Sequence, residues 1–290
     1  MILSLLLVGI ASGVIVGLVM ALVSTGFNIS LGVSRVVNFQ HGGMILWAMY
    51  ATYFFWSATN LNPYLVLLAL VPVSFCVGYG LHRFLSSQSL KTPEDSQILF
   101  SIGLLIALQY LAQFVFTTDA HSLASEQLNG ALIWGPIVMQ YSQLIAGGVA
   151  LVVLVALHVM LARTDLGRFL HACAQNPVGA RVSGLNVEHL SAVAMGIAAV
   201  CAAVCGVALS TLSPVVPERA FEYAILAVVV SVFGGMGSMT GSIAGGLVVG
   251  IIVSTCQAFG YGAVAQSVIY ALVFVIFLVR PTGLAGARQA

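Results

Sequence analysis

Polar side chains that could contact a small solute interrupt an otherwise apolar sequence in two places. The first interruption follows Gly26 and carries amide, hydroxyl and imidazole groups, whereas the second follows Phe233 and consists mainly of glycines. Polar groups inside apolar segments are candidates for a solute path, but they can also satisfy backbone groups that a helix break leaves free. For the glycines, close helix packing is the favoured alternative. The candidate path residues are Asn28, Ser30, Asn38, Gln40, His41, Gly234, Gly235, Gly237 and Ser238.

A third group of candidates lies in the polar segment 163–189, where the residue spacing predicts a short helix. Asn176 suits the N-cap position and Pro177 suits the first helical position. Gly184 suits the position just after the last helical turn, because glycine accepts the left-handed conformation found there. The pattern therefore predicts a helix over residues 177–183.

The predicted short helix carries a small apolar strip beside a positive charge. Val178 and Val182 lie four residues apart, so they share one helix face, and Arg181 is adjacent to them. Such a helix either lies at the lipid interface or docks into a groove on a cytoplasmic partner. The candidate docking residues are Arg168, Asn176, Pro177, Val178, Ala180, Arg181, Val182 and Gly184.

The sequence holds no pattern typical of an enzyme or of a metal site. It contains no grouping of nucleophile, base and orienting residue, and no cluster with metal-ligand spacing. A P-loop requires a lysine after a glycine, but Lys91 follows Leu90 and Ser89. The chain is therefore expected to be non-catalytic, without a metal or cofactor of its own. A formal net charge of +1 excludes the basic field that nucleic-acid binding requires.

The composition predicts that lipid surrounds these candidate residues. Of the 290 residues, 60% are hydrophobic and only 6% are charged, whereas soluble domains carry about 25% charged residues. Because a membrane-spanning helix needs about 20 apolar residues, we expect an all-α polytopic membrane protein with about eight to ten helices or half-helices. Residues 1–290 are expected to form a single transmembrane domain.

Apolar runs between polar breaks place the individual spans. Gly42–Met44 and Gly234–Met236 repeat Gly-Gly-Met beside the two interruptions, which suggests an internal duplication. Broken helices or a tight turn are expected at both places. The predicted spans cover residues 4–27, 43–58, 63–82, 97–116, 141–162, 189–211, 223–258 with a glycine interruption, and 264–280.

Positive charges indicate the orientation of the chain, since cytoplasmic loops carry more Lys and Arg. The opposite loops carry mainly acidic residues, namely Asp119, Glu126, Glu218 and Glu222, against a single Arg219. We therefore predict an external N-terminus and a cytoplasmic C-terminus. The charges that mark the cytoplasmic side are Arg83, Lys91, Arg163, Arg168, Arg181, Arg280 and Arg288.

Three motifs together resemble a known family. Residues 164–185 are similar to the cytoplasmic loop of branched-chain amino acid ABC transporter permeases, typified by the pattern R-T-x-x-G-R, A-x-x-Q-[ND]-P, A-A-R-x-x-G-[IL]. Residues 37–42 resemble the [IV]-N-F-A-H-G motif of that family, and residues 233–238 resemble its L-G-G-x-G-S motif. The N-F-x-H-G form favours the first of the two permease types of this hydrophobic amino acid uptake family.

The resemblance implies a heteromeric importer of the bacterial inner membrane. Its members pair with a second, related permease subunit, two cytoplasmic ATPase subunits that carry ATP and magnesium, and an extracytoplasmic solute-binding protein. The helix in the loop 163–189 would be the coupling helix that contacts an ATPase. This chain departs from the family pattern at Val178, where an acidic residue is usual, at Gly179, where alanine is usual, and at Gly43, where an acidic residue commonly follows His-Gly.

Two functions from different classes remain open on the sequence alone. The resemblance implies import of branched-chain or other hydrophobic amino acids, while similar permeases serve urea, amides or aromatic acids. The alternative is an ATP-independent secondary transporter or channel for a small polar solute. Such transporters often place acidic residues within their spans, whereas every Asp and Glu here falls in a predicted loop or at a helix end.

Overall fold

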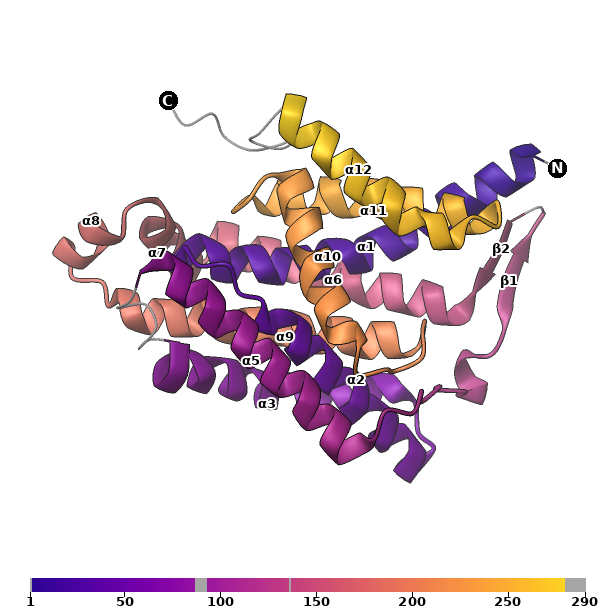
Figure 1. Cartoon of the computed structure of the whole chain (residues 1–290), viewed down its shortest axis with the longest axis horizontal. Helices are drawn as coiled ribbons and strands as arrows, with labels where there is room; N and C mark the ends of the chain where they lie inside the picture. The colour runs from indigo at the N-terminus through magenta and orange to yellow at the C-terminus, as the bar shows by residue number, and fades with distance from the viewer. Residues whose placement is uncertain (1, 87–92, 136, 280–290) are drawn as a thin grey trace.

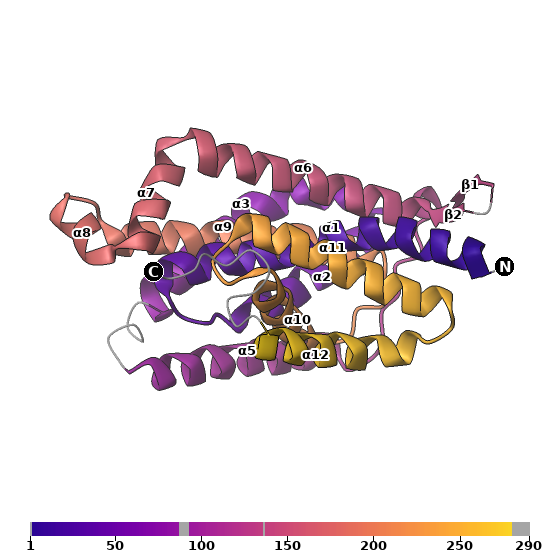
Figure 2. The ribbon, with the colours of Figure 1, turned by 90° about the horizontal axis from the view of Figure 1, so that it is seen from above.

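The computed structural model describes residues 2–86, 93–135 and 137–279, which form a helical bundle with one small hairpin (Figure 1). The elements in chain order are α1 (Ile2–Ser34), α2 (Gln40–Thr59), η1 (Pro63–Val66), α3 (Leu67–Gly80), η2 (Leu81–Ser86), α5 (Glu94–Phe116), η3 (Glu126–Leu128), β1 (Ala131–Trp134), β2 (Ile137–Gln140), α6 (Tyr141–Arg163), α7 (Asp165–Gln175), α8 (Pro177–Val182), α9 (Val187–Ser210), α10 (Arg219–Gly234), α11 (Met239–Ala258) and α12 (Gly262–Val279). The long helices α1, α6, α9 and α11 run lengthwise, and α10 crosses them (Figures 1 and 2).

The described part of the chain contains six helical segments long and apolar enough to cross a membrane. Together with α2, α10 and α12, they fall within the predicted eight to ten helices or half-helices. The prediction of an all-α polytopic membrane protein is thereby confirmed. The six segments are Ile2–Ser34, Pro63–Ser86, Asp95–Phe116, Tyr141–Arg163, Val187–Ser210 and Met239–Ala258.

Helix α9 lies at the centre of the bundle. Nearly all of its residues are buried, and most are alanine, glycine, valine or cysteine. These small side chains let neighbouring backbones approach closely. A Cβ added at Gly206 would lie 2.6 Å from the carbonyl oxygen of Ile45 in α2, and one at Gly196 would lie 2.8 Å from the ring of Phe75 in α3. Bulkier residues at these positions would push α2 and α3 away.

Helices α1 and α11 meet along a stripe of glycines. Gly9, Gly13 and Gly17 recur every fourth residue, so they lie on one face of α1. A Cβ at Gly13 would lie 2.5 Å from the Cα of Ile251, and one at Gly17 would lie 2.8 Å from the Cα of Leu247. Side chains larger than hydrogen at these positions of α1 would separate it from α11.

Segments predicted to share one side of the membrane gather at one end of the bundle. The N-terminal part of α1, the hairpin and the loop before α10 lie at one end, where the backbones of His121 and Val215 exchange hydrogen bonds of 3.1 and 2.8 Å. Helices α7 and α8 lie at the other end, with the start of α5 (Figure 1). Which end faces the cytosol stays a prediction. Lys91, Arg280 and Arg288, which entered that prediction, lie outside the described residues.

Two local expectations need correction. The interruption expected directly after Gly26 does not occur there, because α1 continues to Ser34. The hydroxyl of Ser30 donates to the carbonyl of Phe27 at 2.9 Å, so this polar residue is satisfied within the helix. The break is confined to residues 35–39. The antiparallel hairpin of β1 and β2 was not predicted, since its four-residue strands are too short for a clear alternating pattern.

Candidate functional site

Helix α8 is capped at both ends as its sequence predicts. The side-chain oxygen of Asn176 accepts a hydrogen bond of 2.9 Å from the amide of Gly179. Gly184 adopts a φ of 85°, and the amide of Leu185 bonds the carbonyl of Ala180 at 3.0 Å. A second bond from the Gly184 amide back into the helix completes a Schellman motif. The predicted helix is confirmed, and it ends one residue before the expected limit.

The two faces of α8 differ sharply in exposure. Ala180 is 5% exposed and packs against the bundle, whereas Val178 is 67% and Val182 is 85% exposed. Arg181 is exposed beside the two valines. Isolated exposed valines are ordinary, but these two form a strip on α8, the helix that lies at the outermost tip of the molecule (Figure 1). The structure therefore leaves the apolar strip of α8 open for contact.

Helix α7, which carries α8, was not predicted from the sequence. The hydroxyl of Thr164 accepts from the backbone amide of the third helical residue at 3.2 Å, and Asp165 lies in the first turn. Both signals were visible in the sequence. Leu170 and Cys173 are buried against the bundle, and burial raises the pKa of the Cys173 thiol. Arg168, a predicted docking residue, is exposed and pairs with Asp165 one turn earlier.

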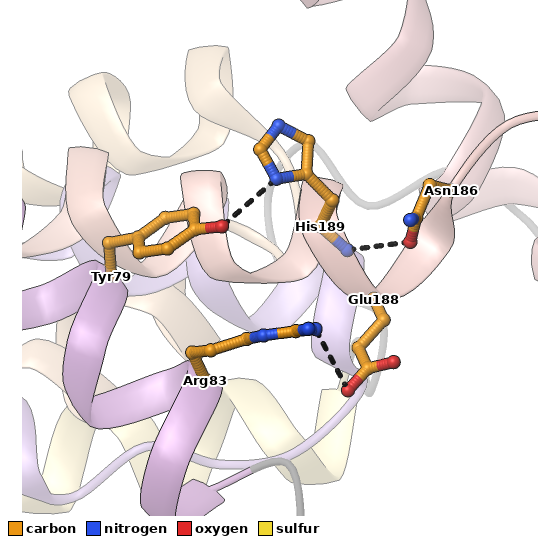
Figure 3. A network of polar contacts seen from close by, with 5 residues as sticks. All are labelled: Tyr79, Arg83, Asn186, Glu188 and His189. Carbon is orange, nitrogen blue, oxygen red and sulfur yellow. Dashed lines mark hydrogen bonds and ion pairs between the residues drawn. The ribbon is translucent and has the colours of Figure 1, made fainter.

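The residues that follow α8, at the start of α9, make polar contacts with the end of α3 and with η2 (Figure 3). Asn186 caps α9 by accepting from the amide of His189 at 3.0 Å. The hydroxyl of Tyr79 lies 3.1 Å from Nδ1 of His189, and Arg83 lies 3.4 Å from the carboxylate of Glu188. The Arg83–Glu188 pair is about half exposed, so it contributes at most about 1 kcal/mol. These contacts fix where the loop 163–189 rejoins the bundle.

A buried hydrogen-bond network joins α1 to α10 and α11. The amide nitrogen of Asn28 donates to the hydroxyl of Ser242 at 2.6 Å, and its oxygen accepts from the amide of Gly237 at 3.1 Å. The hydroxyl of Ser24 lies 2.9 Å from that of Ser231 and donates to Ser242 at 3.2 Å. Sequence reasoning missed these three serines, whose only signal is their occurrence within apolar helices.

The turn between α10 and α11 depends on glycine. Gly235 and Gly237 adopt φ values of 110° and 77°, which favour glycine. Gly234 and Gly241 meet so closely that neither has room for a Cβ. Ser238 caps α11 by accepting from the amide of Gly241 at 3.1 Å. The expected tight turn is confirmed, and the network brings it against Asn28.

A cavity of about 450 Å³ opens beside this network, between α1, α6, α7 and the α10–α11 turn. The hydroxyl of Thr25 is buried at the cavity without a hydrogen-bond partner. No charged side chain among the described residues lines the cavity, and no group of three or more His, Cys, Asp or Glu in the described ranges could hold a metal ion. Its lining is Thr25, Asn28, His158, His171, Ser238 and Thr240 with Ile29, Gly32, Val33, Leu161, Ala162, Leu170, Ala174, Met236, Gly237 and Met239.

Two other path candidates, Asn38 and Gln40, lie at a separate and smaller cavity of about 30 Å³. Their amide nitrogens lie 3.0 and 3.6 Å from the sulfur of Met195. Their side-chain oxygens are buried without partners, as are both ring nitrogens of His82, which lines the same cavity. The structure therefore places Asn38 and Gln40 at a different cavity from Asn28.

The last path candidates pack within the helices. Nε2 of His41 lies 3.2 Å from the carbonyl oxygen of Val23, and its ring lies edge-on to Phe27. The imidazole is completely buried beside Gly26 of α1. Ser30 is likewise bonded within α1. These contacts favour a packing role for His41 and Ser30 over contact with a solute.

The apolar bundle and its helices long enough to cross a membrane define a multi-pass membrane protein. The chain belongs to the family described as the branched-chain amino acid transport system permease component, whose model matches residues 9–278. The predicted resemblance is confirmed. As a member of this family, the chain is a non-catalytic transport subunit of ABC importers, placed in the inner membrane.

Relatives at about one quarter identity align over almost the whole chain. The high-affinity branched-chain amino acid transport system permease protein BraD of Pseudomonas aeruginosa is 26% identical over 97% of this chain and 95% of its own length. LivH of Escherichia coli K12, which has the same description, is 26% identical over 96% of this chain and 94% of its own length. A probable LivH of Methanocaldococcus jannaschii is 25% identical over 92% of this chain and 88% of its own length. No solved structure matches the chain.

Proposed function

We propose that this chain is one of two permease subunits of an ABC importer for branched-chain or other hydrophobic amino acids. The proposal rests on the family and on relatives that carry this description. Its partners are a second related permease, two ATPase subunits that bind ATP and magnesium, and an extracytoplasmic solute-binding protein. Residues 1–290 act as one transmembrane domain, and residues 163–189 are its coupling loop.

The observation that carries the proposal is the exposed apolar strip of α8. Val178 and Val182 are the outward residues of a helix whose opposite side packs on the bundle through Ala180. Burying each valine in a groove of an ATPase contributes about 1.5–3 kcal/mol. Arg181 lies beside them and can donate to a carboxylate on the partner. Because the usual acidic residue is replaced by Val178, we expect a contact that is mainly apolar.

The solute path is proposed to include the larger cavity beside Asn28. The cavity volume of about 450 Å³ lies within the range of roughly 300–1,000 Å³ that is typical of small-molecule sites. Thr25 offers a hydroxyl without a protein partner, and Leu161, Leu170 and Met236 offer apolar walls. This mixture suits a solute with a polar head and an apolar side chain. Without a charged lining residue, selection between solutes falls mainly to the solute-binding protein.

A substitution at the tip of α8 tests the proposed coupling. In the assembled complex, Val182→Asp should lower ATP hydrolysis stimulated by the loaded solute-binding protein roughly tenfold or more, because a carboxylate cannot enter an apolar groove without its water. Val182→Leu keeps the surface apolar and should retain most of the stimulation. Equal stimulation in the Asp and Leu variants would contradict docking through this strip.

The substrate is tested on the cognate solute-binding protein. Calorimetry over a panel of leucine, isoleucine, valine, phenylalanine, urea and an aliphatic amide should give tight binding for the branched-chain amino acids alone or with phenylalanine. Uptake of the same solutes into proteoliposomes should require ATP and the ATPase subunits. Preference for urea would overturn the substrate, and uptake by the purified chain alone would overturn the ABC mechanism.

A further inference from the structure

Arg35 links the end of α1 to the end of α7. Its guanidinium Nη2 donates to the carbonyl oxygens of Ala174 and Gln175 at 3.2 and 3.1 Å, although these residues are about 140 positions away in the sequence. Both acceptors belong to the last turn of α7. That turn has no basic residue of its own. Arg35 therefore supplies from another helix the positive charge that the carboxyl end of α7 favours.

The backbone of Arg35 is adapted to this position. Its φ is 57°, in the left-handed region that non-glycine residues seldom adopt, while its amide still bonds the carbonyl of Leu31 at 2.7 Å. The conformation ends α1 and turns the chain toward α2. Residues in sparsely populated conformations persist where surrounding contacts hold them. Here the two bonds to α7 are the contacts that hold the side chain.

The segment that follows Arg35 leads directly to buried polar groups. Residues 36–39 connect α1 to α2 without regular helix, and Val37 accepts a hydrogen bond of 3.0 Å from Ser101 of α5. Asn38 and Gln40 then line the small cavity with His82. Since their side-chain oxygens have no partner, this break is a place where the buried contacts can rearrange.

Displacement at the break would reach the centre of the bundle through α2. Gly42, two residues into α2, lies so close to the carbonyl of Ala220 and the amide of Ala224 in α10 that a Cβ would collide with both. Helix α10 in turn joins the turn that Asn28 holds. A continuous set of contacts thus runs from α7 through Arg35 to α2 and α10.

We propose that Arg35 is a positioning residue that transmits displacement of the α7–α8 pair to the break between α1 and α2. The inference rests on the proposed function, in which α8 contacts an ATPase. Arg35 does not itself line the solute cavity, although its acceptor Ala174 does, and its two bonds to α7 lie outside the exposed strip of α8. Its removal should therefore affect the link between ATP hydrolysis and transport more than either docking or solute binding.

The test measures ATP hydrolysis and amino acid uptake by the same assembled complex in proteoliposomes. Arg35→Ala should lower the uptake per ATP hydrolysed by about three- to tenfold, the range expected for one contact in a coupled network, with assembly and thermal melting close to wild type. Arg35→Lys keeps the charge without the planar guanidinium, so its uptake per ATP should lie between the values of wild type and Arg35→Ala. Gln175→Ala is the matched control, because the acceptors are backbone carbonyls, and it should leave the ratio unchanged.

Two results distinguish the possible failures. An unchanged uptake per ATP in Arg35→Ala, while Val182→Asp abolishes stimulated hydrolysis, would overturn the role of Arg35 and leave the docking of α8 intact. If Val182→Asp also has no effect, the proposed function itself fails. Should Arg35→Ala prevent assembly, the ratio is measured in Arg35→Gln, whose neutral amide keeps one donor group, and a wild-type ratio there would equally contradict the proposal.

Discussion

The proposed coupling segment, residues 163–189, and the polar core around Asn28 are built in opposite ways. The caps of α8 join residues no more than five positions apart, whereas the core bonds of Ser24 and Asn28 to α10 and α11 cross 207 to 218 positions. The strip on α8 is exposed, and the core is buried. Local caps hold the coupling segment in shape while its surface is free to meet a partner. The core has no such freedom, since each of its contacts depends on how three helices pack.

The largest effect is expected where the core leaves no space. Gly241→Ala would place a methyl group against the carbonyl of Gly234 and separate α10 from α11, so most of the protein should fail to fold into a monodisperse species. Fluorescence-detected size-exclusion chromatography measures this. Gly148→Ala is the control, because a Cβ there meets nothing within 4 Å, and alanine favours a helix interior by up to about 1 kcal/mol. A normal elution profile for Gly241→Ala would show that the turn is not closely packed.

A smaller effect is expected when the core loses its hydrogen bonds but keeps its volume. Asn28→Leu removes the acceptor of the Gly237 amide and one of the hydrogen bonds of the Ser242 hydroxyl, which keeps its bonds with Ser24 and Ser238, at a cost of about 1–3 kcal/mol in all. The melting temperature in detergent should fall, while stimulated ATP hydrolysis by the surviving complex stays measurable. The control Ser57→Ala removes an exposed hydroxyl from α2 and should melt like wild type. Equal melting of Asn28→Leu and wild type would argue against the network.

The sequence predicts the loop 163–189 better than it predicts the buried core. Asn176, Pro177 and Gly184 predicted α8 to within one residue, because capping depends on neighbours in the chain. The tight turn near Gly235 was predicted for the same reason. The bonds of Ser24 to Ser231 and Ser242 could not be predicted, since they exist only when α1, α10 and α11 are already packed. A single sequence does not show which residues of these three helices face one another.

The break after α1 shows the limit of reading polarity as irregular backbone. Asn28 and Ser30 suggested an interruption, but a helix can keep such residues when a serine bonds its own helix and an asparagine reaches a neighbour. The division of path candidates between two cavities was equally beyond the sequence. Asn28 and Asn38 lie close along the chain, yet the end of α1 and the break at residues 35–39 come between them, and they line different cavities.

The smallest effect is expected at the cap of α8. Asn176→Ala removes the bond to the amide of Gly179 and should destabilise this short helix by about 1 kcal/mol, without changing the melting temperature of the bundle. Stimulated ATP hydrolysis should fall several-fold, because the strip is presented for a smaller part of the time. Asn176→Asp keeps the capping oxygen and should restore the activity. If Ala and Asp variants are equally active, the cap does not matter for coupling.

The central claim is that α8 presents its apolar strip to the cytosol and to an ATPase. Site-specific labelling tests it most directly. A cysteine introduced as Val182→Cys is treated with a membrane-impermeant maleimide in inside-out vesicles and in intact cells. Cys173 is buried and the pKa of its thiol is raised, so its background labelling should be low at neutral pH. The same chain with native Val182 is the control for all native cysteines.

We predict labelling of Val182→Cys in inside-out vesicles only, and protection of that cysteine when the ATPase subunits are bound. Labelling from the outside of intact cells would place α8 on the other side of the membrane. Labelling in inside-out vesicles that is equally fast with and without the ATPase subunits would show that no partner covers the strip. Either of these two results would contradict the account.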